Sequence, residues 1–127
     1  MRYTQILGSG AYVPKNIVTN QMMEQIVDTS DEWIQSRTGI KSRPMSVDEN
    51  TSDLAYEASI KALEDAGLKS EDLDLIIVAT VTPDYVFPGV SQLLQKRLNA
   101  KAITAFDINA ACSGFVYALN VDRKSVV

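Results

Sequence analysis

The segment Leu73–Val81 constrains the fold more than any other part of the sequence. It is almost continuously apolar, and Asp74 is its one charged residue. Several of its residues are β-branched, and the turn-forming Thr82-Pro83-Asp84 follows it. Such a run is typical of a strand that is buried on both faces of a parallel sheet. The segment therefore predicts an α/β fold with helices on the sheet.

Helix and strand signals alternate along the 127 residues. The alternation favours a parallel sheet with right-handed crossovers, within one domain. Residues 41–50 are polar and indicate an exposed loop or ribbon. We expect strands at 3–7, 73–81 and 102–108. We expect short helices at 20–27 and 32–38, and longer helices at 50–66, 88–98 and 112–121. Gly39, Gly67 and Asn99 are the predicted helix stops, and Pro88 is predicted to lie in a first helical turn.

Two patterns of small residues occur in the first half of the chain. Gly8-Ser9-Gly10 resembles the start of a dinucleotide-binding loop, but the third glycine is missing, so a turn is the favoured interpretation. Alanines recur at helical spacing within residues 55–66. A face of alanines allows a helix to lie close to a sheet.

Composition limits the classes of function. The net charge of -4 argues against a nucleic-acid-binding surface, which needs a clustered basic excess. The sequence has no histidine and one cysteine, and its carboxylates are scattered, so no metal-ligand cluster is predicted. A single cysteine fits a reducing compartment. No apolar stretch reaches the length of a membrane span, and we expect a soluble cytoplasmic protein.

Cys112 is the strongest candidate for a reactive group. It lies between a predicted strand and a predicted helix, among the small residues Ala110, Ala111, Ser113 and Gly114. Unpaired N–H groups and the helix dipole favour a thiolate at a helix N-terminus, and small neighbours allow a substrate to approach. A lone cysteine among alanines is also typical of a buried structural residue. From the local pattern alone, both interpretations stay open.

Three further residues are candidates for binding. Trp33 and Arg37 could hold a planar phosphorylated ligand by stacking and charge, although a half-buried tryptophan beside a surface arginine is the commoner arrangement. Phe87, next to Pro88, fits either an exposed anchor for a partner or an ordinary core residue.

Two long motifs resemble a known family, β-ketoacyl-acyl carrier protein synthase III. They occur in the family's order and separation, and Val78-Ala79-Thr80 and Phe87-Pro88 between them also match, so that the similarity covers residues 1 to about 121. The motifs are Thr29-Ser30-Asp31-Glu32-Trp33-Ile34 with Arg37-Thr38-Gly39-Ile40, and Asp107-Ile108-Asn109-Ala110-Ala111-Cys112-Ser113-Gly114-Phe115-Val116-Tyr117-Ala118-Leu119.

The resemblance implies the amino-terminal part of a thiolase-like layered fold and an acyltransferase of fatty acid biosynthesis. In this family a cysteine takes an acyl group, commonly acetyl, from acyl-coenzyme A, and malonyl-acyl carrier protein then supplies the attacking carbanion. Cys112 matches that cysteine. Thr29, Trp33 and Arg37 match residues at the coenzyme A adenine, and Phe87 matches a residue that reaches across a homodimer. No permanently bound cofactor is implied.

Two departures from the family pattern bear on activity. The family's carboxy-terminal half, which supplies a catalytic histidine and asparagine, is absent, so the isolated chain is expected to lack turnover. From Asp122 onward the sequence also leaves the family's apolar helix pattern.

Two alternatives stay open: a non-catalytic remnant that binds coenzyme A or an intact subunit, and a related thiolase-fold condensing enzyme that makes polyketide or 3-hydroxy-3-methylglutaryl products.

Overall fold

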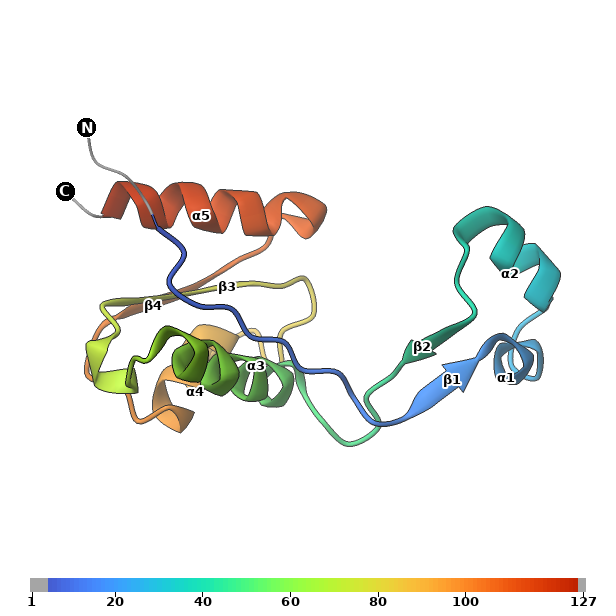
Figure 1. The fold of residues 1–127 in the computed structure, drawn as a ribbon, viewed down its shortest axis with the longest axis horizontal. Coiled ribbons are helices and arrows are strands. Elements are labelled where there is room, and N and C mark those ends of the chain that lie inside the picture. The colour runs from blue at the N-terminus through green and yellow to red at the C-terminus, as the bar shows by residue number, and fades with distance from the viewer. Residues whose placement is uncertain (1–4, 126–127) are drawn as a thin grey trace. The chain divides into compact units, whose positions relative to one another are not determined.

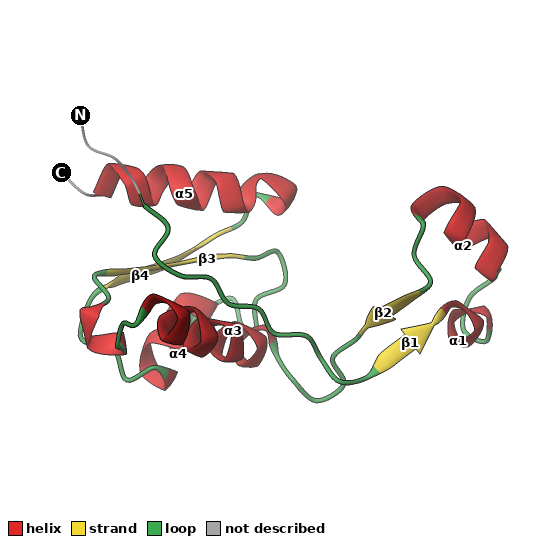
Figure 2. Cartoon of the chain, in the orientation of Figure 1, coloured by secondary structure: helices red, strands yellow, loops and turns green. Residues whose placement is uncertain are grey.

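The computed structural model describes residues 5–125, which form two compact units (Figures 1 and 2). The larger unit contains residues 5–12 and 50–125, and the smaller unit is Val13–Glu49. In the described part of the chain, no helix is both long and apolar enough to cross a membrane. The two units are described separately below.

The larger unit is a layered α/β structure. A two-stranded parallel sheet lies between one helix on one face and two helices on the other (Figure 1). Its elements are α3 (Thr51–Ala66), a 3-10 turn (Ser70–Asp72), β3 (Leu75–Ala79), α4 (Val90–Arg97), β4 (Thr104–Ile108), a second 3-10 turn (Ala111–Ser113) and α5 (Gly114–Ser125), with α5 on one face and α3 and α4 on the other.

Local signals set the bounds of α3. Its N-cap is Asn50, whose backbone N–H donates to the carboxylate of Asp53 at 2.7 Å. Asp53 also pairs with Arg97, whose guanidinium lies 4.6 Å from the ring centroid of Tyr56. The helix ends at Gly67, which adopts the left-handed conformation with φ 66° that glycine tolerates best. Both predicted ends of this helix are confirmed.

Strands β3 and β4 pair in parallel, with Ile77 opposite Phe106 and Ala79 opposite Ile108. The predicted parallel pairing is confirmed, but the prediction that the first of these strands is buried on both faces is wrong. Only Ile76 of β3 is buried, and Ala79 is exposed. The reason is that the described sheet has two strands, too few for full cover on both faces.

A side chain of α4 reaches the edge of β4 that faces away from β3. The Ile108 carbonyl accepts from the Thr80 N–H of the neighbouring chain segment. The Ala105 carbonyl lies three residues before that of Ile108 in the strand, and because successive residues of a strand alternate in direction, it points away from β3. It accepts from the Gln92 side-chain amide at 2.6 Å. Leu94 and Leu98 pack with Ile76 in the core of this unit. Pro88 precedes the N-cap Gly89, so its predicted place in the first helical turn is wrong.

The segment 5–12 lies against the alanine face of α3. A Cβ atom built on Gly8 would meet the Ala62 carbonyl oxygen at 2.5 Å and the Ala66 nitrogen at 2.6 Å, and one on Gly10 would meet Ala58 and Ala62. Gly8-Ser9-Gly10 is therefore a site of close packing. The strand predicted at 3–7 is wrong for residues 5–7, which have no strand assignment. Residues 3 and 4 lie outside the described part.

The smaller unit holds a ribbon and two short helices. Strand β1 (Ile17–Thr19) pairs antiparallel with β2 (Ser42–Pro44), which confirms the ribbon expected within 41–50. Helix α1 (Asn20–Glu24) is shorter than predicted, and α2 (Asp31–Thr38) ends at Gly39 with φ 72°, as expected. Strand β1 was not predicted.

Candidate active site

Cys112 lies on the turn that joins β4 to α5. The turn begins after Ile108, and the Ser113 N–H donates to the Ala110 carbonyl at 3.0 Å. The side chain of Cys112 is exposed, which excludes the buried structural interpretation. Because β4 runs parallel to β3, this turn lies at the carboxyl edge of the sheet, where ligands bind in open α/β sheets.

Ala111, immediately before Cys112, has a positive φ of 45°. A residue with a Cβ atom rarely adopts this conformation, and such strain tends to occur at functional sites. A sharp turn between a strand and a helix is also the setting in which a nucleophile elbow presents its side chain. Cys112 itself is in the 3-10 turn Ala111–Ser113, and α5 begins two residues later, at Gly114.

Gly114 allows α5 to lie close to β3. It is buried, and a Cβ atom built on it would lie 3.0 Å from the Cβ of Ala79. The room that its missing side chain leaves is thus used for packing between a helix and a strand. The expectation that Gly114 makes room for a substrate is wrong in this respect.

The second group of candidates lies in the smaller unit. Thr29 and Trp33 line an open pocket of about 610 Å³ together with Val27, Asp28 and Ser30. The Trp33 ring is 52% exposed, and the guanidinium of Arg37, one turn along α2, lies 4.5 Å from its centroid. The structure therefore brings Thr29, Trp33 and Arg37 together. A pocket of this size can hold a planar ring with part of its substituent.

A buried asparagine organises the elements around this pocket. Asn20 is fully buried, and its side-chain amide donates to Asp31 and to the Ile40 carbonyl, both at 2.7 Å. Its oxygen accepts from Arg43 at 2.6 Å. The hydrogen bond that Asn20 donates to Asp31, with a further one from Gln35, holds the pKa of the Asp31 carboxyl below its usual value. Asn20 thereby fixes the start of α2, which carries Trp33.

Phe87 lies in the larger unit, in the loop before α4. Its side chain is 83% exposed, and the neighbouring Val86 is fully exposed. The peptide bond between Phe87 and Pro88 is cis. Among the described residues, therefore, Phe87 is not an ordinary core residue.

Sequence reasoning missed the roles of two residues at these sites. Asn20 stands at the start of a predicted short helix, and no sequence signal distinguishes a capping asparagine there from a buried one. Ala111 was considered only for its small size, since an alanine gives no sign of a positive φ.

Known proteins are similar to this chain in both sequence and fold. A β-ketoacyl-[acyl-carrier-protein] synthase III of Clostridium perfringens is 56% identical over 126 residues, which are 99% of this chain and 39% of that protein. Over nearly its whole length, the chain is similar to β-ketoacyl-acyl carrier protein synthase III. It matches the amino-terminal part of these enzymes, which are transferases, and it spans about 39% of the length of the curated relatives. No protein-family model matches the chain.

Solved structures agree with this assignment. The crystal structure of 3-oxoacyl-[acyl-carrier-protein] synthase III from Aquifex aeolicus superposes with a TM-score of 0.93 at 52% identity, over 96% of this chain and 40% of that one. The priming β-ketosynthase from the R1128 polyketide pathway superposes equally well, with a TM-score of 0.93, but is 36% identical, over 98% of this chain and 38% of that one. The predicted thiolase-like α/β fold and the predicted synthase III family are confirmed.

Proposed function

We propose that this chain carries the acyl-accepting part of a 3-oxoacyl-acyl carrier protein synthase of fatty acid biosynthesis. One observation carries the proposal: the only cysteine of the chain is exposed on a turn at the carboxyl edge of a parallel sheet. The strained backbone at Ala111 and the motif around Cys112 support the same assignment.

In the first step of this function, the sulfur of Cys112 attacks the thioester carbonyl of acyl-coenzyme A, most commonly acetyl. The new carbon–sulfur bond forms a tetrahedral intermediate. Its collapse breaks the bond to the coenzyme A sulfur, which leaves as a thiolate and takes up the proton that Cys112 has lost. One thioester replaces another, so the exchange needs little driving force.

In the second step, malonyl-acyl carrier protein loses carbon dioxide, and the electron pair of the broken bond becomes a carbanion. This carbanion attacks the acyl-Cys112 carbonyl and expels the sulfur. The products are 3-oxoacyl-acyl carrier protein, carbon dioxide and free Cys112. The proposal requires no permanently bound cofactor.

Thr29, Trp33 and Arg37 are proposed to bind the adenine end of coenzyme A. The guanidinium of Arg37 lies over the Trp33 ring, 4.5 Å from its centroid. Two stacking contacts of roughly 3.5 Å each would be needed to place a base between them, that is a separation of about 7 Å. Arg37 is exposed and its side chain can move outward to admit the base, while its charge attracts phosphate.

The remaining parts of the proposal concern the whole enzyme. Phe87 is proposed to contact a second subunit of a homodimer, consistent with its exposure. We expect the enzyme to act in the cytoplasm, without nucleic acid or membrane as a partner. Because this chain has no histidine, we expect the isolated chain to take up an acyl group slowly and to lack condensation.

Mass spectrometry tests the proposal. The chain is incubated with acetyl-coenzyme A, and wild type is compared with Cys112→Ser. We expect one acetyl group on wild type, which neutral hydroxylamine removes because it cleaves thioesters and not amides. Acetylation that persists in the variant would overturn the proposal. Ordinary condensation turnover by the purified 127-residue chain would overturn the expectation that it lacks condensation.

Two alternatives have specific observations behind them. The lack of any histidine favours a chain that binds coenzyme A or an intact subunit without turnover. The TM-score of 0.93 to a priming β-ketosynthase keeps a related condensing enzyme open, although the higher identities of 52% and 56% are to synthase III proteins. Reading the coding DNA beyond Val127 for histidine and asparagine motifs distinguishes the first alternative from the enzyme.

A further inference from the structure

Asp107, at the end of β4, caps the N-terminus of α4. One carboxylate oxygen accepts from the Val90 N–H at 2.7 Å and the other from the Ser91 N–H at 2.8 Å. Helix N-termini leave such N–H groups without partners inside the helix, and the N-cap of α4 is Gly89, which has no side chain to serve them. The cap therefore comes from the strand that leads to Cys112.

Gly89 and Asp107 form a matched pair. A Cβ atom built on Gly89 would lie 2.8 Å from one carboxylate oxygen of Asp107 and 3.0 Å from its Cγ, and also 2.7 Å from the end of the flexible Gln92 side chain. Gly89 has an ordinary φ of -70°, so its backbone conformation does not require glycine. Glycine is required at this position because the Asp107 carboxylate approaches so closely.

The contact between Asp107 and the N-terminus of α4 fixes the end of β4 from one direction, and the pairing with β3 fixes it from the other. Asp107 lies opposite Val78 in the ladder, and the Ile108 carbonyl accepts from the Thr80 N–H at 3.1 Å. The chain then passes through Ala111, with its positive φ, to Cys112. A strained turn persists only where its surroundings determine it, and the anchored end of β4 is the nearest such support.

We propose that Asp107 is a positioning residue for Cys112. By binding the N-terminus of α4, it fixes the end of β4 and thus the conformation of the turn 109–113 from which the thiol is presented. It acts through the backbone and does not touch the reacting atoms. The functional part of this inference rests on the proposed role of Cys112 as acyl acceptor.

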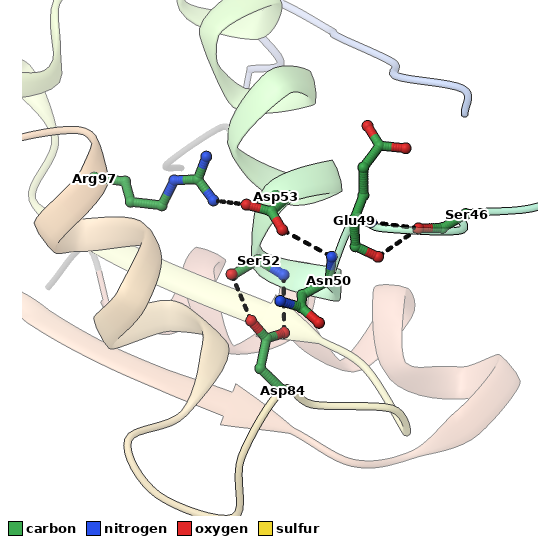
Figure 3. A network of polar contacts seen from close by, with 7 residues as sticks. All are labelled: Ser46, Glu49, Asn50, Ser52, Asp53, Asp84 and Arg97. Carbon is green, nitrogen blue, oxygen red and sulfur yellow. Dashed lines mark hydrogen bonds and ion pairs between the residues drawn. The ribbon is translucent and has the colours of Figure 1, made fainter. Parts of the chain in front are cut away.

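The chain offers a matched control in Asp84. Its carboxylate accepts from the Ser52 N–H at 2.9 Å and from the Ser52 hydroxyl at 2.5 Å, and so caps α3 from the loop after β3 (Figure 3). Asp84 and Asp107 thus each serve a helix N-terminus in the same unit, Asp107 through two backbone N–H groups and Asp84 through one backbone N–H and one hydroxyl. Only Asp107 is on the strand that leads into the nucleophile turn.

The experiment separates capping from positioning. Asp107→Ala removes the cap, and adding Gly89→Asp supplies a local one, because the N-cap backbone is already extended. Without the Asp107 carboxylate, the nearest neighbour left to a Cβ at position 89 is the end of the flexible Gln92 side chain, which can shift to admit it. Three quantities are measured on the full chain: the melting temperature, amide hydrogen exchange of residues 109–113, and the rate of Cys112 acetylation by acetyl-coenzyme A.

We expect Asp107→Ala and Asp84→Ala to lower the melting temperature similarly, by about 4 °C. Only Asp107→Ala should speed exchange in the turn and slow acetylation, by about tenfold. The added Gly89→Asp should restore the melting temperature but neither of the other two quantities. If it restores all three, or if Asp84→Ala speeds exchange in the turn equally, the inference is overturned.

Two further outcomes are decisive as well. Should Asp107→Ala fail to fold, Asp107→Asn replaces it, because the amide keeps one acceptor oxygen for α4. This variant should show the same changes in exchange and acetylation to a smaller degree. Wild-type values of both quantities would overturn the inference. Should wild type not be acetylated at all, the proposed function fails. The exchange of residues 109–113 then still decides whether Asp107 positions the turn.

Discussion

Gly114, the first residue of α5, faces Ala79 of β3 so closely that an added Cβ atom would lie 3.0 Å from the Cβ of Ala79. This approach seats the start of α5, and with it the turn that carries Cys112, on the sheet. Helices and strands pack this closely only where small residues face one another.

Gly114→Ala therefore tests whether this contact matters. Alanine has the higher helix propensity, so propensity alone predicts a gain in stability. The steric argument predicts a loss of about 1 kcal/mol in the free energy of unfolding, measured with urea. Ala79→Gly in the same chain should relieve most of that loss, and a stabilised single variant would contradict the packing argument.

The pKa of Asp53 predicts how stability depends on pH. Hydrogen bonds from the Asn50 N–H and from Arg97 hold the pKa of this carboxyl below its usual value of 3.8. A lowered pKa means that the charged form stabilises the fold, fully above the unfolded-state pKa and progressively less as pH falls through the folded-state pKa. Asp53→Asn should lower the melting temperature at about pH 7.

The difference between wild type and Asp53→Asn should then shrink as pH falls below 3.8. The effect is expected to be small, because the ion pair is about one-third exposed to solvent and water screens it. Arg97→Gln should reduce the pH dependence without abolishing it, since the hydrogen bond from the Asn50 N–H remains. A difference that grows in acid would contradict the assignment.

Trp33 is the only tryptophan of the chain, so its fluorescence reports directly on the proposed adenine site. We expect saturable quenching by coenzyme A, and none by pantetheine, which lacks the base. Arg37→Ala should weaken binding about fivefold, because one exposed cation–π or phosphate contact contributes about 1 kcal/mol. Equal quenching by pantetheine would contradict the placement of the adenine.

The apolar surface of the larger unit predicts self-association. Phe115, Val116 and Tyr117 on α5 are 67%, 62% and 54% exposed, and Val86 and Phe87 are exposed beside α4. Apolar side chains that gather on a surface favour association. Sedimentation velocity of the isolated chain should show species that grow with concentration, and Val116→Lys should reduce them. A monomer with a sharp melt at every concentration would contradict this prediction.

Elements whose signals are local could be predicted from the sequence. The bounds of α3 follow from Asn50 and Gly67, and the end of α2 follows from Gly39, because a helix cap depends on its own few residues. The parallel pairing of β3 and β4 followed from the alternation of strands and helices. The motif around Cys112 indicated the family.

Features that depend on distant contacts could not be predicted. Strand β1 has three residues, too few for a periodic pattern to show, and it exists through its pairing with β2. Neither the buried position of Asn20 nor the positive φ of Ala111 has a signature in the sequence. The pairing of Gly89 with Asp107 needs the packing of α4 against β4, which no local pattern contains.

The most direct test of the account compares acyl transfer at two positions of a single cysteine. The first protein is wild type, and the second carries Cys112→Ser with Asn120→Cys, which moves the thiol to an exposed position farther along α5. The measured quantity is the rate of thioester formation with acetyl-coenzyme A, divided by the rate of alkylation with iodoacetamide. We predict that this ratio is at least about tenfold higher for Cys112, whereas equal ratios would contradict the claim that its turn is built for acyl transfer.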